Sequence, residues 1–339
     1  MSTKIEWCDE TINPIQDVRK GPSGRGYHCT KCSPGCDHCY AERINNIRGN
    51  GFPFEPFEDH RFIRFELIES ELEKVRRSKK HKSIFVQSMG DLFHEAVPDE
   101  FIGRTYEAMA NASHHTFLLL TKRLGRMIPF VWPDNVWPGL TICNQKEADK
   151  KIPVFLQVSG KKFLSIEPIL GAVDLYLNST GKRMCRNCCW GDRCDNPHHY
   201  HRPNCPICRG EGSIGKIDAV ILGAETGPGA RPMHPDWVRS IRDQCAAAGV
   251  PFFFKGWGAW VQSEYKSYSV FDKKSAGKFQ VSTCVSSTDR KSVGQTNYYP
   301  IPFGYDGLPM GIARMERGKV AGRLLDGRTH DDLPWRVSR

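Results

Sequence analysis

The stretch SIFVQSMGDLFHEAVPDEFIGRTYEAMANASHHTFLLLTK, residues 83–122, holds two apolar runs separated by a segment with helical spacing. The runs at 83–89 and 115–122 are rich in β-branched and aromatic residues, which favour strands. Pro98 begins the middle segment in the manner of a helix start, and apolar residues recur after it every three to four positions. The stretch therefore predicts a strand–helix–strand unit with two parallel strands.

The same alternation continues toward the carboxyl terminus. A second helix is predicted to start at Pro235 and to end before Gly249. Continuous apolar strands that alternate with amphipathic helices are typical of a parallel sheet covered by helices. We therefore predict an α/β fold, a complete or partial (β/α) TIM-like barrel. Further strand-like runs occur at 135–143, 161–168, 218–225 and 250–257.

Composition limits the class of protein. No apolar run in the 339 residues approaches the roughly 18 residues of a membrane span, and the amino terminus lacks the layout of a signal peptide. We expect a cytoplasmic protein that does not insert into a membrane. Its 14 cysteines are then expected to be metal ligands or reduced thiols, because cytosolic reductants keep most thiols unpaired.

The charge balance is basic. The chain has 48 lysines and arginines against 38 acidic residues, and the densest basic run spans residues 73–82. A positive field favours a polyanionic partner, so we expect a nucleotide or nucleic acid as substrate. The alternative is that the run is only a solvated basic helix end.

Polar residues gather where the predicted strands end. In a parallel barrel the carboxyl ends of the strands line the active site. One such residue alone is more often a strand-end hydrogen bond or cap, but recurrence at six ends favours a site. Lys122, Glu167 and Glu225 are candidate catalytic residues. Lys122 is suited to neutralising a substrate phosphate and Glu167 to proton transfer, with binding of a ribose as the alternative for Glu167. The other candidates are Gln87, Ser88, Asp91, Arg123, Asn144, Gly223, Gly227, Lys255 and Trp257.

A segment between two of the predicted strands has the pattern of a zinc site. Cys185 and Cys188 form one C-x2-C pair, and Cys205 and Cys208 form another after sixteen intervening residues. This spacing predicts four thiolates around one tetrahedral zinc ion. We expect a structural knuckle that holds the insertion together, with contact to nucleic acid through its arginines as the alternative.

A second group of cysteines lies in HCTKCSPGCDHCYAER, residues 28–43. Cys32, Cys36 and Cys39 have the C-x3-C-x2-C spacing in which three thiolates bind a [4Fe-4S] cluster and leave one iron open. Cys29 gives an alternative, because two C-x2-C pairs can also form a closed zinc site. The position after a first strand-like segment and before a helix favours iron.

This spacing, with Tyr40 directly after the last cysteine, resembles the radical S-adenosyl-L-methionine (SAM) enzymes. The resemblance implies that SAM binds the open iron and that an electron donor reduces the cluster. It also implies a 5′-deoxyadenosyl radical that abstracts a hydrogen atom from the substrate. Gln87, Ser88 and Asp91 are then expected near the methionine end of SAM. Glu225, in the glycine-rich turn from Gly223, is expected at its ribose, with a purely structural tight turn as the alternative.

Eight longer motifs occur along the chain: IEWCDETINP, CSPGCDHCYAER, QSMGDLFHEAVPDEFI, HTFLLLTKR, SIEPILGAVDL, GAETGPGARPMHPDWVRSIRDQC, GVPFFFKGWGAW and KVAGRLLDGRTHDDLP. Through them nearly the whole chain, apart from the two insertions, is similar to an uncharacterised, bacteriophage-associated family of radical-SAM-like barrel proteins. The similarity implies a barrel and a phage or prophage origin. In that family the first cysteine stands seven positions before the second, which matches Cys29 and leaves the third ligand open between Cys29 and Cys32.

These observations predict a radical SAM enzyme that modifies a base or reverses a lesion in a nucleotide or nucleic acid. A non-enzymatic, zinc-dependent nucleic-acid-binding protein is the alternative. A metal-independent hydrolase using Asp91, Glu167 and Glu225 is a third hypothesis. We expect the barrel at 1–177 and 217–264, the zinc insertion at 178–216, a flexible insertion at 265–300 and a carboxyl-terminal segment at 301–339.

Overall fold

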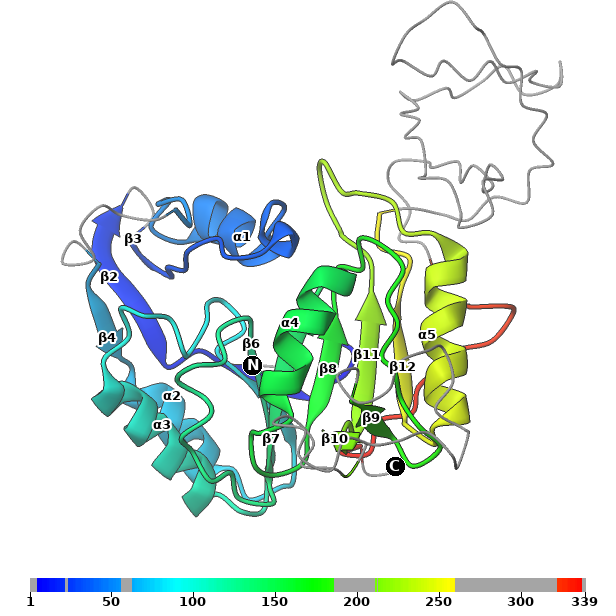
Figure 1. The fold of residues 1–339 in the computed structure, drawn as a ribbon. Coiled ribbons are helices and arrows are strands. Elements are labelled where there is room, and N and C mark those ends of the chain that lie inside the picture. The colour runs from blue at the N-terminus through cyan, green and yellow to red at the C-terminus, as the bar shows by residue number, and fades with distance from the viewer. Residues whose placement is uncertain are drawn as a thin grey trace, which may run out of the picture.

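A seven-stranded parallel sheet forms the centre of the protein. The computed structural model describes residues 5–21, 24–55, 63–185, 211, 213–259 and 322–336. Neighbouring strands pair in parallel in chain order, so the sheet curves as a half-barrel without a reversal of direction (Figure 1). The strands are β1 (Glu10–Ile12), β5 (Ser83–Val86), β6 (Thr116–Thr121), β7 (Val136–Ile142), β8 (Phe163–Ile166), β11 (Ala219–Gly223) and β12 (Phe252–Gly256).

Four helices pack on one face of this sheet: α2 (Glu69–Arg77), α3 (Asp99–Asn111), α4 (Gln145–Phe155) and α5 (Pro235–Ala247). A fifth helix, α1 (Tyr40–Arg48), lies beyond the carboxyl edge of the sheet (Figure 1), and two small antiparallel sheets complete the described structure. The smaller sheets contain β2 (Ile15–Gly21), β3 (Gly24–Gly26) and β4 (Phe65–Leu67), and β9 (Lys182–Met184) and β10 (Ser213–Lys216).

The predicted α/β class is confirmed: the large parallel sheet forms a half-barrel, which is compatible with a partial TIM-like fold. The strand–helix–strand unit of residues 83–122 is present as β5, α3 and β6, and α3 begins directly after Pro98. The helix expected before Gly249 ends at Ala247. Gly249 adopts φ of 61°, a conformation that glycine reaches without a steric penalty.

The two faces of the sheet pack against different partners. Phe117 and Leu119 of β6 belong to the larger apolar cluster, on the helix side, whereas Leu118 belongs to a second cluster on the inner face. This alternation follows from the two-residue period of a strand. The inner face is closed near its amino end by residues distant in sequence, because Trp335 Nε1 donates to the Trp7 carbonyl at 2.9 Å.

The carboxyl-terminal segment is part of this inner core. Trp335 stacks edge-on against Trp137 with ring centroids 5.0 Å apart, and Phe163 lies 5.3 Å away. The backbone before it runs along the free edge of β12, where Phe254 N–H donates to the His330 carbonyl at 2.9 Å. Residues 322–336 therefore help to hold the half-barrel together.

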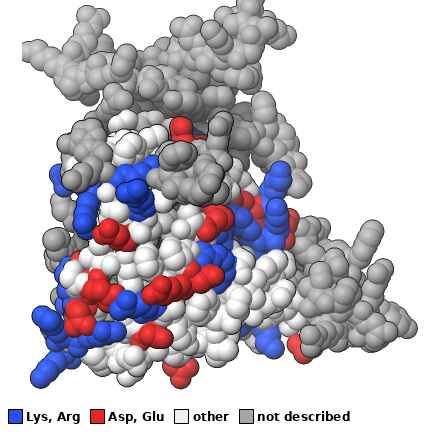
Figure 2. Space-filling view, turned by 90° about the vertical axis from the view of Figure 1, so that its left-hand side faces the viewer, with Lys and Arg blue, Asp and Glu red and all other residues white. Residues whose placement is uncertain are grey.

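The basic run at 73–82 lies on and after α2, where much of its charge is balanced. Lys74 pairs with Glu71, and Arg76 and Arg77 both pair with Glu73. Figure 2 shows lysines, arginines and carboxylates intermingled on the face it displays. The solvated-helix alternative therefore describes this run better than a dedicated polyanion surface.

Several expectations concern residues outside the described ranges. The flexible insertion at 265–300 lies wholly outside them, as does most of the zinc insertion. Within the described part of the chain, the helices are too short or too polar to span a membrane.

We predict that Trp335→Ala lowers the free energy of unfolding by about 3 to 5 kcal/mol, because it empties a buried aromatic site and removes a hydrogen bond. Urea denaturation followed by circular dichroism measures this change. Val131→Ala, at a side chain that is 76% exposed, is expected to change the same quantity by less than about 0.5 kcal/mol. Equal effects of the two substitutions would contradict the role of the carboxyl-terminal segment.

Candidate functional site

The cysteine-containing segment 28–39, called the cysteine loop below, lies at the carboxyl edge of the main sheet. It follows the β2–β3 hairpin and leads into α1, whose N-cap is Cys39. Within the loop, Ser33 caps the short 3-10 helix Pro34–Cys36 by accepting from the Gly35 N–H. Ser33 Oγ also lies 3.7 Å from Cys143 Sγ, which places the loop against the end of β7.

The four thiols of the loop influence one another. Cys32 donates a hydrogen bond to Cys36, and this bond together with the positive charge of Lys122 lowers the pKa of Cys36 to about 5 despite burial. The same bond raises the pKa of Cys32. Burial raises the pKa of Cys29 to about 12, and the nearby Asp91, Cys39 and Cys36 act in the same direction. One thiolate is therefore present at neutral pH within a group of four sulfur atoms.

Two cations from the end of β6 face these thiols. Burial alone would lower the pKa of Lys122, but Cys36 and Cys39 outweigh that effect and raise it. Arg123 donates through Nη1 to Cys29 Sγ at 3.6 Å and through Nη2 to the Thr30 carbonyl at 2.6 Å. The predicted candidate Lys122 and its neighbour are thus brought to the cysteine loop.

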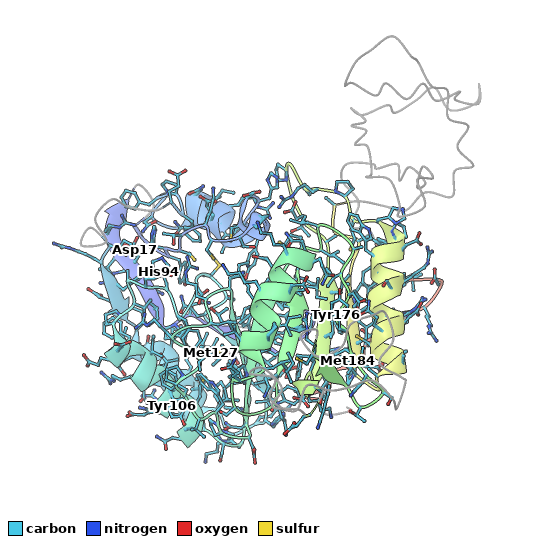
Figure 3. All side chains as sticks on the ribbon, in the orientation of Figure 1. Asp17, His94, Tyr106, Met127, Tyr176 and Met184 are labelled. Atoms are coloured by element: carbon cyan, nitrogen blue, oxygen red, sulfur yellow. The ribbon has the colours of Figure 1, made fainter. Side chains whose placement is uncertain are left out.

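A polar network beneath the loop supports Arg123. Thr30 Oγ1 accepts from Arg123 at 2.7 Å and lies 3.1 Å from His94 Nε2. His94 follows β5, and its ring centroid lies 5.8 Å from that of His28, which comes just after the β2–β3 hairpin; Figure 3 labels His94 and Asp17 of β2. The network joins the hairpin, the cysteine loop and the end of β6.

Asp91, predicted near the cofactor, is occupied by protein donors. Thr121 Oγ1 lies 2.8 Å and 2.9 Å from its two carboxylate oxygens, and Lys122 N–H donates to it at 3.2 Å. Phe93 N–H donates to the same group at 3.0 Å. Asp91 therefore orients the end of β6 and, through it, the two cations.

Gln87 and Ser88 connect β5 to the segments around the cysteine loop. The Gln87 amide makes two hydrogen bonds to the backbone of Ile15, at 3.0 Å and 2.9 Å. Ser88 Oγ donates to Asn13 Oδ1 at 3.3 Å, and the Ser88 carbonyl accepts from the Tyr40 hydroxyl. Both predicted candidates therefore lie at the site, and the side-chain oxygen and nitrogen of Gln87 both bind the start of the hairpin.

The glycine-rich turn after β11 fastens the cysteine loop. Arg231 N–H donates to Glu225 at 2.8 Å, and its guanidinium pairs with the same carboxylate. That guanidinium also donates to Asp37 at 3.1 Å and to the Pro34 carbonyl at 2.7 Å. The buried Glu225 therefore holds Arg231 and, through it, the turn and the cysteine loop together.

Gly227 and Gly229 are needed because the turn is crowded. Both have positive φ, and a Cβ at Gly227 would lie 1.4 Å from Arg43 Nη1. A Cβ at Gly229 would lie 3.0 Å from the His38 ring. The loop and the turn therefore pack directly on each other.

Glu167, the other predicted catalytic residue, forms an ion pair with Lys255. This pair joins the ends of β8 and β12. The Tyr40 hydroxyl is near it: burial raises the pKa of Tyr40, and the charges of Cys39 and Glu167 add to the increase. Glu167 therefore lies within electrostatic range of the residue that follows the last cysteine.

Cys143 and Tyr40 belong to the site although no role for them follows from sequence spacing. Burial, together with Glu147, raises the pKa of the Cys143 thiol to about 11. The signal that identifies Cys143 is its position directly after β7, since every other strand end of the series contributes polar groups to this edge. Asn144 caps α4 by accepting from Glu147 N–H, which is the ordinary role of such a residue.

The structure describes the predicted iron-sulfur ligands in full but only one of the four predicted zinc ligands. Cys188, Cys205 and Cys208 lie outside the described ranges, and Cys185 is buried. Across the described ranges, no three or more His, Cys, Asp or Glu side chains are grouped so as to hold a metal ion. The cysteine loop therefore shows thiols next to the cations Lys122 and Arg123, not an assembled metal site.

The family of proteins of unknown function DUF5131 matches residues 2–334. The match covers nearly the whole chain, so the protein belongs to this family. No curated protein and no solved structure matches the chain.

We predict that the metal-free protein, titrated by the ultraviolet absorbance of its thiolates, shows a deprotonation of Cys36 with a midpoint near pH 5. Because this pKa is lowered relative to the unfolded chain, the thiolate favours the folded state above the unfolded pKa. The contribution is lost as the pH falls through about 5. Cys36→Ser is expected to remove this step and Lys122→Met to move it upward. Cys245→Ser is the control, and thiolate formation only above pH 8 would contradict the assignment.

We further predict that Arg231→Met lowers the free energy of unfolding by about 2 to 3 kcal/mol, because it leaves the buried Glu225 carboxylate without its cation. The value is below the usual range for buried pairs, since Arg231 itself is partly exposed. Denaturant unfolding gives the measurement. Arg76→Met, in an exposed pair with Glu73, should lower the free energy of unfolding by about 0.5 kcal/mol or less. A similar loss in both variants would contradict the stabilising role of the Arg231–Glu225 pair.

Proposed function

We propose that the protein is a radical SAM iron-sulfur enzyme of phage or prophage origin that acts on a nucleotide or nucleic acid, by base modification or lesion reversal. One observation carries the proposal: four cysteine thiols and two cations meet at the carboxyl edge of a parallel half-barrel. That edge is where catalytic groups gather in parallel barrels.

The chemistry of the donors suits an iron-sulfur cluster, although the described side chains are not already grouped as a metal site. Thiolates are the usual protein ligands of such clusters, and Cys36 has a lowered pKa. Lys122 and Arg123 are close enough to offset the negative charge of thiolates and sulfide. Cys36 and Cys39 are ligands in either arrangement of the cysteine loop. The third ligand is Cys29, which Arg123 holds, or Cys32, which bonds to Cys36.

When held by three of these cysteines, a cluster with one open iron would supply, with an electron from an external donor, the reductive cleavage of SAM to methionine and a 5′-deoxyadenosyl radical able to take a hydrogen atom from the substrate. The chain's own residues hold and orient the reactants. Lys122 provides positive charge beside the thiols, and Arg231 keeps the cysteine loop against the sheet. Glu167 is a carboxylate at the same edge that can exchange a proton with the substrate.

The zinc insertion adds a second, structural metal to the proposal. Its four predicted ligands, Cys185, Cys188, Cys205 and Cys208, have the spacing of a knuckle. Zinc there would hold the insertion between β9 and β10 and take no part in the radical chemistry.

The test is anaerobic reconstitution with iron and sulfide, followed by dithionite and SAM. We predict absorbance near about 400 nm, roughly four iron atoms per chain and release of 5′-deoxyadenosine. Cys36→Ala and Cys39→Ala should each abolish all three signals, whereas Cys245→Ala, at a buried thiol of α5, should keep them. Separate Cys29→Ala and Cys32→Ala variants identify the third ligand, because only its loss removes the cluster.

Metal content also separates this proposal from its alternative. A reconstituted protein that holds zinc without iron, and that cleaves no SAM, would refute the enzyme. That result would favour a zinc-dependent nucleic-acid-binding protein instead.

A further inference from the structure

Three polar residues, Ser165, Glu167 and Lys255, lie near the carboxyl edge of the half-barrel on its inner face, outside the cysteine loop. Phe163 lies beside Ala219 on this face, and two positions further on Ile221 lies between Ser165 and Phe253; the four apolar residues belong to the inner apolar cluster. Ser165 and Lys255 each follow one of these residues by two positions, and Glu167 follows Ser165 by two. By the strand period, the three polar side chains belong to the same inner face.

The Glu167–Lys255 pair crosses a strand to form. β11 lies between β8 and β12, and Gly223 is the residue of β11 that lies beneath the pair. A Cβ at Gly223 would lie 3.2 Å from Lys255 Cβ and 3.4 Å from Glu167 Oε1. Glycine here therefore leaves just enough room for the two side chains to meet.

The Glu167–Lys255 pair is partly exposed to solvent, and the buried hydroxyl of Ser165 lies two positions before Glu167 in the chain. The side chains of Lys255 and Glu167 are 31% and 20% exposed. Ser165 Oγ is fully buried, and within the described part of the chain it has no hydrogen-bond partner. An unsatisfied buried hydroxyl is uncommon in native structures and is expected to find a partner.

The chemistry of this group indicates what it binds. Lys255 offers N–H donors and Glu167 offers acceptor oxygens a short distance apart. A ligand that presents a donor and an acceptor on adjacent atoms satisfies both, and the Watson–Crick edge of a nucleobase has that arrangement. A lone phosphate would satisfy Lys255 and be repelled by Glu167.

We infer that Glu167 and Lys255, positioned across Gly223 and assisted by Ser165, form the subsite that recognises the base edge of the substrate. The inference rests on the proposed function for its substrate class. The Tyr40 hydroxyl, which follows Cys39, is within electrostatic range of Glu167, so a base held here lies next to the cysteine loop.

The test compares nucleotides that differ only at the base edge. UMP is compared with 3-methyluridine 5′-monophosphate, and AMP with purine riboside 5′-monophosphate, by anaerobic calorimetry on the reconstituted protein. Each modified nucleotide lacks the N–H group that would donate a hydrogen bond to Glu167. We expect the unmodified nucleotide to bind at least about tenfold more tightly in one of the two pairs, since hydrogen bonds to charged groups are the strong ones.

Variants then assign the discrimination to the subsite. Glu167→Met should reduce the ratio within that pair to below about twofold, and Lys255→Met should weaken binding of both nucleotides about tenfold. Lys82→Met is the matched control. Lys82 pairs with Glu10 at the opposite, amino-terminal end of the sheet, with side-chain exposures of 34% and 15%. It should leave the ratio unchanged.

A ratio below twofold in both pairs, an undiminished ratio in Glu167→Met, or no binding of any of the four nucleotides would overturn the inference. Release of 5′-deoxyadenosine from SAM alone, measured on the same preparations, separates this result from failure of the proposed function. SAM cleavage without base discrimination refutes only the subsite. Base discrimination without SAM cleavage refutes only the radical chemistry.

Discussion

Seven strands pair in parallel and in chain order, so every carboxyl end reaches the same edge of one curved sheet. This constraint brings together residues from Asn13 to Lys255 that are far apart in the sequence. It also gives the cysteine loop a surface to pack on, because the loop follows the first strand and must cross the other strand ends. The candidate site exists only where these two conditions are met.

Many polar residues at that edge are used to hold the site together. Asp91 orients the end of β6, Gln87 binds the hairpin and Glu225 binds Arg231. Each satisfies a buried donor or charge that would otherwise be costly. Fewer side chains at this edge are placed to bind a ligand as well. Among the described residues these include the cysteines of the loop and the partly exposed Glu167–Lys255 pair.

Electrostatic balance explains why four thiols can lie so close together. Thiolates in a partly buried loop repel one another and are disfavoured by desolvation. Lys122 and Arg123 oppose both effects, and the hydrogen bond from Cys32 concentrates the negative charge on Cys36. The same two cations would also stabilise a negatively charged cluster bound at this loop.

Local periodicity, together with turn and cap residues, was enough to predict the parallel α/β class, the starts of α3 and α5, and the set of strand-end candidates. The roles of those candidates follow from contacts that form only in the folded chain. Whether Asp91 or Glu167 is free depends on partners 30 and 88 positions away, Thr121 and Lys255, which no local pattern encodes. The closure of the inner face by Trp7 and Trp335 is likewise a contact between the two ends of the chain, set by packing of the folded sheet and not by spacing.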